Sequence, residues 1–205
     1  MFLVVCLVVA LAVRLWQVWP RLSSSFLPTA RKSGSFGPVL FVLGSGGHTA
    51  ELLPVASSLG DSASPKVFVA AEERSLERAK ALEKNASFVQ IPRARAVGQS
   101  YLTSVATTLW ALLFSVATVL RFRPRLVLCN GPGICVPIAA AAMLLRLVGG
   151  RSACRVVFIE SGCRVESLSL SGKILYRLCL VDAFLVQWES LQQRVPKSIY
   201  LGRTL

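Results

Sequence analysis

The chain has 205 residues, a net charge of +13 from 23 Lys and Arg against 10 Asp and Glu, and 54% hydrophobic but only 16% charged residues. At roughly 150 residues per domain, this length excludes an enzyme with two complete nucleotide-binding halves. The hydrophobic content excludes intrinsic disorder. The charge indicates a polyanionic partner, which composition leaves open as nucleic acid, a phosphorylated substrate or an anionic membrane surface.

Residues 1–20 are expected to form a transmembrane anchor. Met1–Val13 has no charge, and the apolar stretch can cross a bilayer if Arg14 snorkels. Basic residues follow this stretch and none precedes it, so the positive-inside rule places the N-terminus in the lumen and the remainder in the cytosol. A cleaved signal peptide is the alternative, although the basic n-region is missing. Residues 21–38, rich in Ser, Pro and Gly, are typical of a linker.

From residue 39 to residue 205, strand-like and helix-like segments alternate. Strands are expected at Val39–Leu43, Lys66–Ala70, Phe88–Ile91, Leu126–Cys129, Val156–Ile159 and Phe184–Gln187. Helices are expected at Thr49–Leu59, Ser75–Lys84, Tyr101–Leu120, Val136–Leu147, Ser171–Leu180 and Ser190–Arg194. The alternation predicts an α/β fold with a Rossmann-like, doubly wound parallel sheet.

Tyr101–Leu120 is ambiguous because it has no charged residue and is followed by Arg121, Arg123 and Arg125. A second membrane span is one interpretation. Its Ser and Thr content and its place in the alternation favour a crossover helix packed on the sheet. An apolar face of that helix could touch a bilayer with the three arginines at lipid phosphates, or the arginines could simply be solvated.

Two glycine-containing loops are expected to meet in one crevice. In an open parallel sheet, ligands bind beyond the carboxyl ends of the strands where the strand order reverses, commonly between strands one and four. The residues concerned are Gly44, Ser45, Gly46 and Gly47 after the first strand and Asn130, Gly131 and Gly133 after the fourth. Glycines and helix N-termini turn backbone N–H groups toward an anion, so a diphosphate is the expected ligand.

Side chains beside this crevice are candidates for chemistry. His48 opens the first helix of the domain, where it could bind phosphate, act as a base on a hydroxyl, or merely cap the helix. Glu160 closes the fifth strand, where it could accept a sugar hydroxyl or pair with Arg164. Arg93 and Arg95 follow the third strand and are candidate phosphate contacts, with plain surface charge as the alternative. Arg164, in the loop after the fifth strand, is a further candidate contact of the diphosphate.

Other chemistries have weaker support. The first loop departs from G-x-G-x-x-G because Thr49 occupies the third glycine position, and Glu72 lies farther along than a dinucleotide site requires. There is no Walker lysine motif and no G-x-S-x-G elbow. The six cysteines show no C-x-x-C spacing and accompany a single histidine, so we expect reduced, mostly buried thiols and no metal site.

Several motifs together resemble one family. They are Gly44–Thr49, Leu126–Gly133, Glu160–Ser161 with Arg164–Glu166, Ser171–Lys173 and Pro196–Arg203. The family is the membrane-anchoring subunit of the UDP-N-acetylglucosamine transferase of dolichol-linked oligosaccharide synthesis. This family is similar to the N-terminal, acceptor-binding half of the bacterial lipid-linked GlcNAc transferase of peptidoglycan synthesis, a two-domain GT-B enzyme. The resemblance therefore implies one half of a GT-B fold.

The resemblance also implies partners and a reaction. A soluble catalytic subunit would supply the UDP-GlcNAc-binding half, and this chain would recruit it to the cytosolic face of the endoplasmic reticulum membrane. The complex would add a second GlcNAc to GlcNAc-diphospho-dolichol with inversion, while this chain alone would be inactive. No cofactor, metal or nucleic-acid partner is implied. A base must deprotonate the acceptor 4-hydroxyl, and positive groups must hold the diphosphate.

Carried over to this chain, Gly44–Gly47 would contact the diphosphate and His48 would lie near the acceptor, preferred over Glu160 as the catalytic group. The residues implied to dock the catalytic partner are Tyr200, Leu201, Gly202, Arg203 and Leu205. Two alternatives remain open. One is a membrane scaffold whose glycine loops are purely structural, and the other is a membrane-tethered NAD(P) oxidoreductase.

Overall fold

The computed structural model describes residues 2–20, 22, 36–96, 98–150 and 153–202. Most of the expected linker, residues 21–38, therefore lies outside the described residues. The described strands are β1 (Val39–Leu43), β2 (Lys66–Ala70), β3 (Ala86–Gln90), β4 (Leu126–Asn130), β5 (Arg155–Ile159), β6 (Ala183–Val186) and β7 (Ile199–Tyr200). The helices are α1 (Phe2–Val18), α2 (Gly47–Ser58), α3 (Glu73–Leu82), α4 (Tyr101–Phe122), α5 (Cys135–Gly149), α6 (Leu170–Arg177) and α7 (Glu189–Arg194), with a 3₁₀ turn at Gly60–Ser62.

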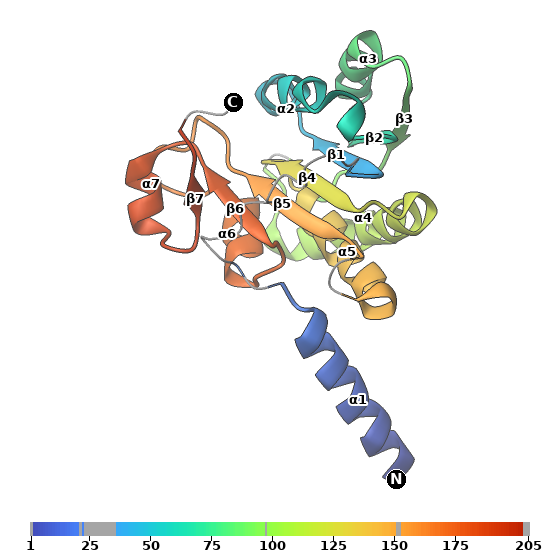
Figure 1. Ribbon diagram of the computed structural model, residues 1–205. Coiled ribbons are helices and arrows are strands. Elements are labelled where there is room, and N and C mark those ends of the chain that lie inside the picture. The colour runs from blue at the N-terminus through green and yellow to red at the C-terminus, as the bar shows by residue number, and fades with distance from the viewer. Residues whose placement is uncertain (1, 21, 23–35, 97, 151–152, 203–205) are drawn as a thin grey trace.

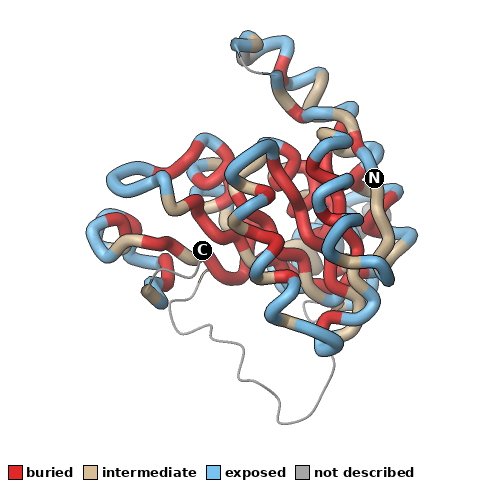
Figure 2. The backbone as a smooth tube through the Cα atoms, turned by 90° about the horizontal axis from the view of Figure 1, so that it is seen from above, coloured by how far each residue is buried: buried red, intermediate tan, exposed pale blue. Residues whose placement is uncertain are grey.

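The described strands form one parallel sheet in the order β3-β2-β1-β4-β5-β6-β7. The predicted Rossmann-like fold is confirmed, including the reversal of strand order between β1 and β4. The central strand β1 (VLFVL) is buried along its whole length. A strand apolar on both faces suits a parallel sheet because the crossover helices cover both faces. Buried residues accordingly run through the middle of the domain (Figure 2).

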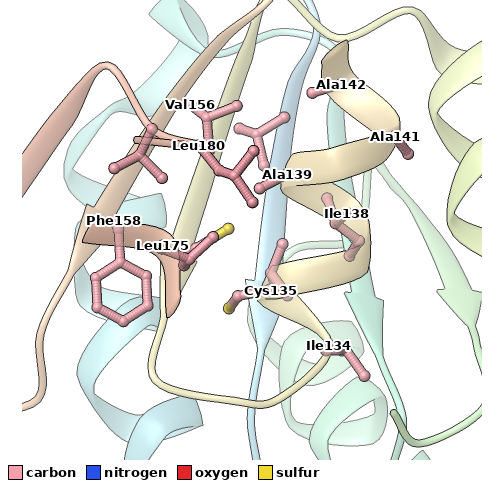
Figure 3. Close-up of a cluster of buried hydrophobic side chains, with 14 of the residues drawn as sticks. Ile134, Cys135, Ile138, Ala139, Ala141, Ala142, Val156, Phe158, Leu175 and Leu180 are labelled. Carbon is pink, nitrogen blue, oxygen red and sulfur yellow. The ribbon is translucent and has the colours of Figure 1, made fainter. Parts of the chain in front are cut away.

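Helices α4, α5 and α6 cover one face of the sheet, and α2 and α3 cover the other (Figure 1). Under α5, Ile138 and Ala139 pack toward Val156 and Phe158 of β5 and Leu175 of α6 (Figure 3). The alanine-rich sequence of α5 lets its backbone approach the sheet closely. Apolar burial on both faces is the main source of stability, at about 25 cal/mol for each Å² removed from water.

The predicted elements agree with the structure to within a few residues, with one omission. β7 (Ile199–Tyr200) was missed because two residues are too short to show a strand pattern. Tyr101–Leu120 is the crossover helix that the alternation predicted, since α4 connects β3 to the parallel strand β4. The six cysteines all lie within the described residues and are free thiols.

Helix α1 projects from the domain and is held at its C-terminal end (Figure 1). Arg14 Nε donates a hydrogen bond to Leu147 O at the end of α5 over 3.0 Å, and Trp19 Nε1 donates to Leu178 O over 3.1 Å. Arg14 therefore satisfies a carbonyl left free at a helix C-terminus. Among the described helices, one segment, Leu102–Phe122, has the length and hydropathy of a membrane span, and α1 contributes a shorter apolar segment, Val4–Val18.

A buried ion pair joins α5 to the sheet. The Arg146 side chain is fully buried, and its guanidinium pairs with Asp182 and donates through Nε to Cys154 O over 2.7 Å. Asp182 also accepts a hydrogen bond from Val156 N over 2.8 Å. Both charges thus have several hydrogen-bond partners. These contacts offset the large cost of removing an ion pair from water.

We predict that Asp182→Ala destabilises the domain by about 3–5 kcal/mol, because it leaves the Arg146 charge buried without its partner. The measurement is the thermal unfolding midpoint of the detergent-solubilised chain. The matched control is Glu166→Ala, which removes the exposed pair with Arg194 (3.7 Å). Exposed pairs contribute at most about 1 kcal/mol, so equal shifts in the two variants would contradict the assignment.

Candidate functional site

The first glycine loop turns tightly from β1 into α2. Gly44 O accepts hydrogen bonds from Thr49 Oγ1 over 2.5 Å and from Ser75 Oγ over 2.7 Å, which ties the loop to α2 and α3. Gly46 caps α2 with a φ of 55°, a left-handed conformation that favours glycine. The loop therefore places the N-terminus of α2 at an exposed position beyond the end of β1, and a helix N-terminus favours an anion.

The second loop follows β4, which is the neighbour of β1 across the switch point. Asn130 ends β4, and Gly131 has a φ of 69°. The His48 imidazole packs directly over Gly131, where any Cβ would collide with the ring. Gly131 is thus needed both for its backbone conformation and for the close approach of His48. The structure brings together the two loops that the sequence predicted would meet.

The His48 imidazole faces two side-chain oxygens, of which one lies at hydrogen-bond distance. Its Nδ1 lies 2.8 Å from Asn130 Oδ1 and 3.6 Å from Glu51 Oε2. An amide oxygen only accepts hydrogen bonds, so the contact with Asn130 Oδ1 requires the tautomer with the proton on Nδ1, and in that tautomer the lone pair of the imidazole lies on Nε2. The side chain is 33% exposed, which leaves it accessible to a ligand. This arrangement suits a base that acts through Nε2.

Glu51 is a site residue that the sequence reasoning missed. Its Oε1 accepts hydrogen bonds from Ser161 Oγ over 2.8 Å and from Gly162 N over 3.1 Å, which joins α2 to the loop after β5. Its Oε2 is buried and has no hydrogen-bond partner among the described residues. The available signal was the spacing, since a residue three positions after His48 lies on the same helix face.

An open cavity of about 200 Å³ lies beyond the carboxyl ends of β1 to β4. Ser45, His48 and Gly133 from the two loops line it, together with Arg93 and Arg95 from the loop after β3. It therefore combines glycine-loop backbone, a histidine and two guanidinium groups. Such a set of donors fits an anionic ligand with a hydroxyl that can be deprotonated.

The two arginines are anchored by neighbouring groups. Arg93 Nη2 lies 2.8 Å from Glu72 Oε1, and the Arg93 side chain is 54% exposed. Arg95 donates through Nη2 to Gln99 O over 2.9 Å. These contacts orient both guanidinium groups at the cavity wall. Glu72, the acidic residue of the dinucleotide alternative, is engaged by Arg93 in this structure.

Glu160 lies apart from the cavity. It closes β5 as predicted, but its side chain is fully buried and does not belong to the described lining. Its carboxylate accepts hydrogen bonds from Ser169 N over 2.9 Å, Ser169 Oγ over 3.1 Å and Ser161 N over 3.2 Å. The expected pairing with Arg164 is not among the ion pairs of the described residues, and Arg164 is exposed. The partners of the Glu160 carboxylate are therefore these three Ser donors and not the Arg164 guanidinium.

The contacts of Glu160 serve the start of α6. Ser169, which donates to Glu160, also accepts a hydrogen bond from Gly172 N over 3.0 Å and caps that helix. Burial raises the pKa of Glu160 above its ordinary value, while the Ser169 and Ser161 donors oppose the rise. The raised pKa means that the folded chain binds the proton of Glu160 more tightly than the unfolded chain does.

We predict that the stability contribution of protonated Glu160 is present below its unfolded pKa and is lost as pH rises through its folded pKa. The measurement compares thermal unfolding of the wild type and Glu160→Gln from about pH 4 to 7, a window set by the ordinary carboxyl pKa. The stability of the wild type relative to the variant should fall as pH rises. A stability of the wild type that instead increases relative to the variant as pH rises would contradict the raised pKa of Glu160. Glu77→Gln on exposed α3 is the control.

The expected docking segment lies at the edge of the sheet. Tyr200 belongs to the edge strand β7 and is 37% exposed, and Leu201 is 49% exposed. Gly202 is partly exposed, with a φ of 81°. Arg203 and Leu205, which were also expected to contact a partner, lie outside the described residues. The exposed apolar side chains are therefore available at the end of the described chain.

Comparison with known proteins identifies the family. Residues 39–204 match a family model described as "Oligosaccharide biosynthesis protein Alg14 like". The chain belongs to the Alg14 family. A protein of Rattus norvegicus named "UDP-N-acetylglucosamine transferase subunit ALG14" is 46% identical over 96% of this chain and 93% of its own length. The Homo sapiens protein of that name is 42% identical over 91% of this chain and 90% of its own.

A solved structure with a similar fold is MurG of Acinetobacter baumannii. The TM-score is 0.55 at 18% sequence identity, covering 73% of this chain and 40% of the MurG chain. This likeness confirms that the Alg14-family chain has the fold of part of a GT-B glycosyltransferase. The chain spans less than half of the MurG chain.

Proposed function

We propose that this chain is the acceptor-binding and membrane-anchoring subunit of a UDP-N-acetylglucosamine transferase, and that it acts in the second step of dolichol-linked oligosaccharide synthesis. The observation that carries the proposal is a cavity lined by two glycine-containing loops, His48, Arg93 and Arg95 at the β1/β4 switch point of a domain that corresponds to only part of a GT-B enzyme. Relatives named as transferase subunits support it. A separate soluble subunit would supply the UDP-GlcNAc-binding half, and this chain alone would be inactive.

In this proposal, the acceptor diphosphate lies against the two glycine loops. Backbone N–H groups of Gly44–Gly47, and of Gly131 and Gly133, at the starts of α2 and α5, bind its oxygens. Arg93 and Arg95 neutralise charge from the other wall of the cavity, where both side chains lie. Fixed donors of this kind hold the reacting group without reorganisation during the reaction.

His48 is the proposed base. Its Nε2 accepts the proton of the acceptor hydroxyl while the hydroxyl oxygen forms a bond to the anomeric carbon and the bond from that carbon to UDP breaks. This displacement inverts the anomeric carbon. Asn130 and Glu51 lie next to Nδ1 and orient the imidazole, and the Glu51 carboxylate stabilises the imidazolium that forms. Glu160 would support the fold around α6 rather than touch the acceptor.

Residues 1–20 would anchor the complex in the endoplasmic reticulum membrane by a single pass, with the N-terminus in the lumen and the domain in the cytosol. The apolar α1 and the basic residues after it support this orientation. The contacts of Arg14 and Trp19 with the domain would keep the cavity at a set position relative to the bilayer. The exposed Tyr200 and Leu201 would dock the catalytic subunit.

We predict transfer of radiolabelled GlcNAc from UDP-GlcNAc to GlcNAc-diphospho-dolichol only when this chain and the donor-binding subunit are combined. Each component is assayed alone and together in microsomal membranes. The combined sample should be active because only it contains both GT-B halves. Robust transfer by this chain alone would falsify the half-enzyme proposal.

The variant His48→Ala separates this proposal from the scaffold alternative. Loss of transfer by a complex that still assembles supports a direct role, because removing a general base typically costs about 100-fold or more. Unchanged transfer would favour the scaffold. Ser58→Ala, at the far end of the same helix, is the matched control. Titration with dinucleotide tests the oxidoreductase alternative.

We predict that Glu51→Gln lowers kcat about tenfold and leaves KM unchanged, because the variant removes a carboxylate charge 3.6 Å from Nδ1, and a loss of about 1.4 kcal/mol in stabilisation of the imidazolium is a factor of ten in rate. Gln keeps an oxygen for Ser161 and Gly162 but cannot stabilise the imidazolium. Steady-state kinetics of the reconstituted complex measures both constants, with Glu77→Gln as control. A rise in KM at constant kcat would instead assign Glu51 to acceptor binding.

A further inference from the structure

Trp188 follows β6 and reaches the loop after β5. These two strands are parallel neighbours that pair Ile159 with Leu185, so the segments leaving their carboxyl ends lie at the same edge of the sheet. Trp188 Nε1 donates a hydrogen bond to Gly162 O over 2.7 Å, and the bond is partly buried. An indole N–H only donates, and the ring sets its direction. The bond therefore fixes Gly162 relative to β6.

The Trp188 side chain is itself held in place. Its ring packs against the buried apolar cluster that α5 and α6 share with the sheet, part of which Figure 3 shows. The Trp188 carbonyl accepts hydrogen bonds from Leu191 N over 3.2 Å and from Gln192 N over 3.1 Å at the start of α7. The residue thus joins a strand to a helix, and its position is constrained from both sides.

The loop that Trp188 holds is exposed from residue 163 to residue 167. Ser190 and Arg194 of α7 also donate to carbonyl oxygens of this loop, over 3.2 Å and 2.9 Å, but both bonds are exposed to solvent. Water can replace the donor in an exposed hydrogen bond, whereas a shielded carbonyl that loses its donor stays without a partner. Among these three bonds, the one from Trp188 therefore contributes most to the position of the loop.

The same loop holds Glu51 from the other side. Ser161 Oγ and Gly162 N donate to Glu51 Oε1 over 2.8 Å and 3.1 Å, while Oε2 lies 3.6 Å from His48 Nδ1. Oε2 is buried and has no hydrogen-bond partner among the described residues. A glutamate side chain has several rotatable bonds, and an unpartnered carboxylate oxygen is better solvated in water. Glu51 thus stays beside His48 only while the loop keeps its donors in place.

We propose that Trp188 is a positioning residue of the transfer reaction, which keeps the Glu51 carboxylate beside the His48 imidazole. The indole acts through two hydrogen bonds in series, from Trp188 Nε1 to Gly162 O and from Gly162 N to Glu51 Oε1. Trp188 does not touch the acceptor in this scheme. The inference rests on the proposed role of His48 as the base and names a residue on which that role depends.

The reactivity of His48 tests this inference without the transfer reaction. His48 is the single histidine of the chain, so the absorbance of carbethoxylated imidazole, formed with diethyl pyrocarbonate, measures this ring alone. The full chain in detergent is assayed at about pH 8, where imidazoles are mostly neutral. A carboxylate beside Nδ1 makes Nε2 more nucleophilic. Glu51→Gln should therefore slow the reaction, and Trp188→Phe, which keeps an aromatic ring but removes the N–H, should slow it by up to the same factor.

The double variant separates positioning from damage to the fold. If Trp188 acts through Glu51, Trp188→Phe in the Glu51→Gln background should cause no further loss, whereas independent damage would multiply the two losses. Trp19→Phe is the matched control, because Trp19 Nε1 also donates to a backbone carbonyl, Leu178 O, over 3.1 Å. That variant should leave the rate of carbethoxylation unchanged. Multiplied losses, an unchanged rate in Trp188→Phe or an unchanged rate in Glu51→Gln would each overturn the proposal.

Steady-state kinetics of the reconstituted complex gives a second readout. Trp188→Phe should lower kcat about threefold to tenfold and leave KM unchanged, because the lost contact acts on the imidazolium that forms and not on the bound acceptor. A rise in KM at constant kcat would overturn the positioning role. A wild-type complex without transfer would overturn the proposed function instead, and the carbethoxylation rates would still decide whether Trp188 places Glu51 beside His48.

Discussion

Parallel pairing of β1 with β4 is the constraint on which the site depends. It places the loop after β1 beside the loop after β4, although 82 residues separate His48 from Asn130. Because Gly131 has no side chain, the His48 imidazole can pack over the second loop and reach the Asn130 amide. The strand order therefore creates the cavity, and the glycines let its parts approach each other. The position of the His48 imidazole beside both loops follows from this packing.

Buried ionic groups hold the elements around that site in place. Glu51 fastens α2 to the loop after β5, and Glu160 fastens the end of β5 to the start of α6. Arg146 and Asp182 join α5 to the sheet on its other side. Each of these groups is bonded to backbone donors or acceptors as well as to side chains, so displacing one element would leave buried polar atoms unpaired. Such bonds fix the positions of the loops, as the proposed binding of an anion requires.

The two faces of the sheet have different surroundings. On one side, α3 is rich in charge and suits contact with water. On the other side, α4 directs leucines and Trp110 outward, and α1 leaves the domain nearby. This asymmetry relates the proposed anchoring to the proposed chemistry, since α4 also holds the loop of Arg93 and Arg95. Hydrogen bonds from Thr107 and Thr108 thus join the cavity wall to α4 directly.

Sequence alone determined the alternation of strands and helices, the reversal beside β1, the glycine loops and His48, because periodicity and turn chemistry are local properties. The family motifs likewise indicated one half of a GT-B fold, which the comparisons confirmed. Tertiary structure decided which carboxylate meets His48. Glu51 lies beside the imidazole, whereas Glu160 is drawn to the N–H groups at α6, since hydrogen-bond partners depend on packing between distant segments. It also decided which face of α4 is buried, because an almost uncharged helix has no strong polarity of its own to orient it.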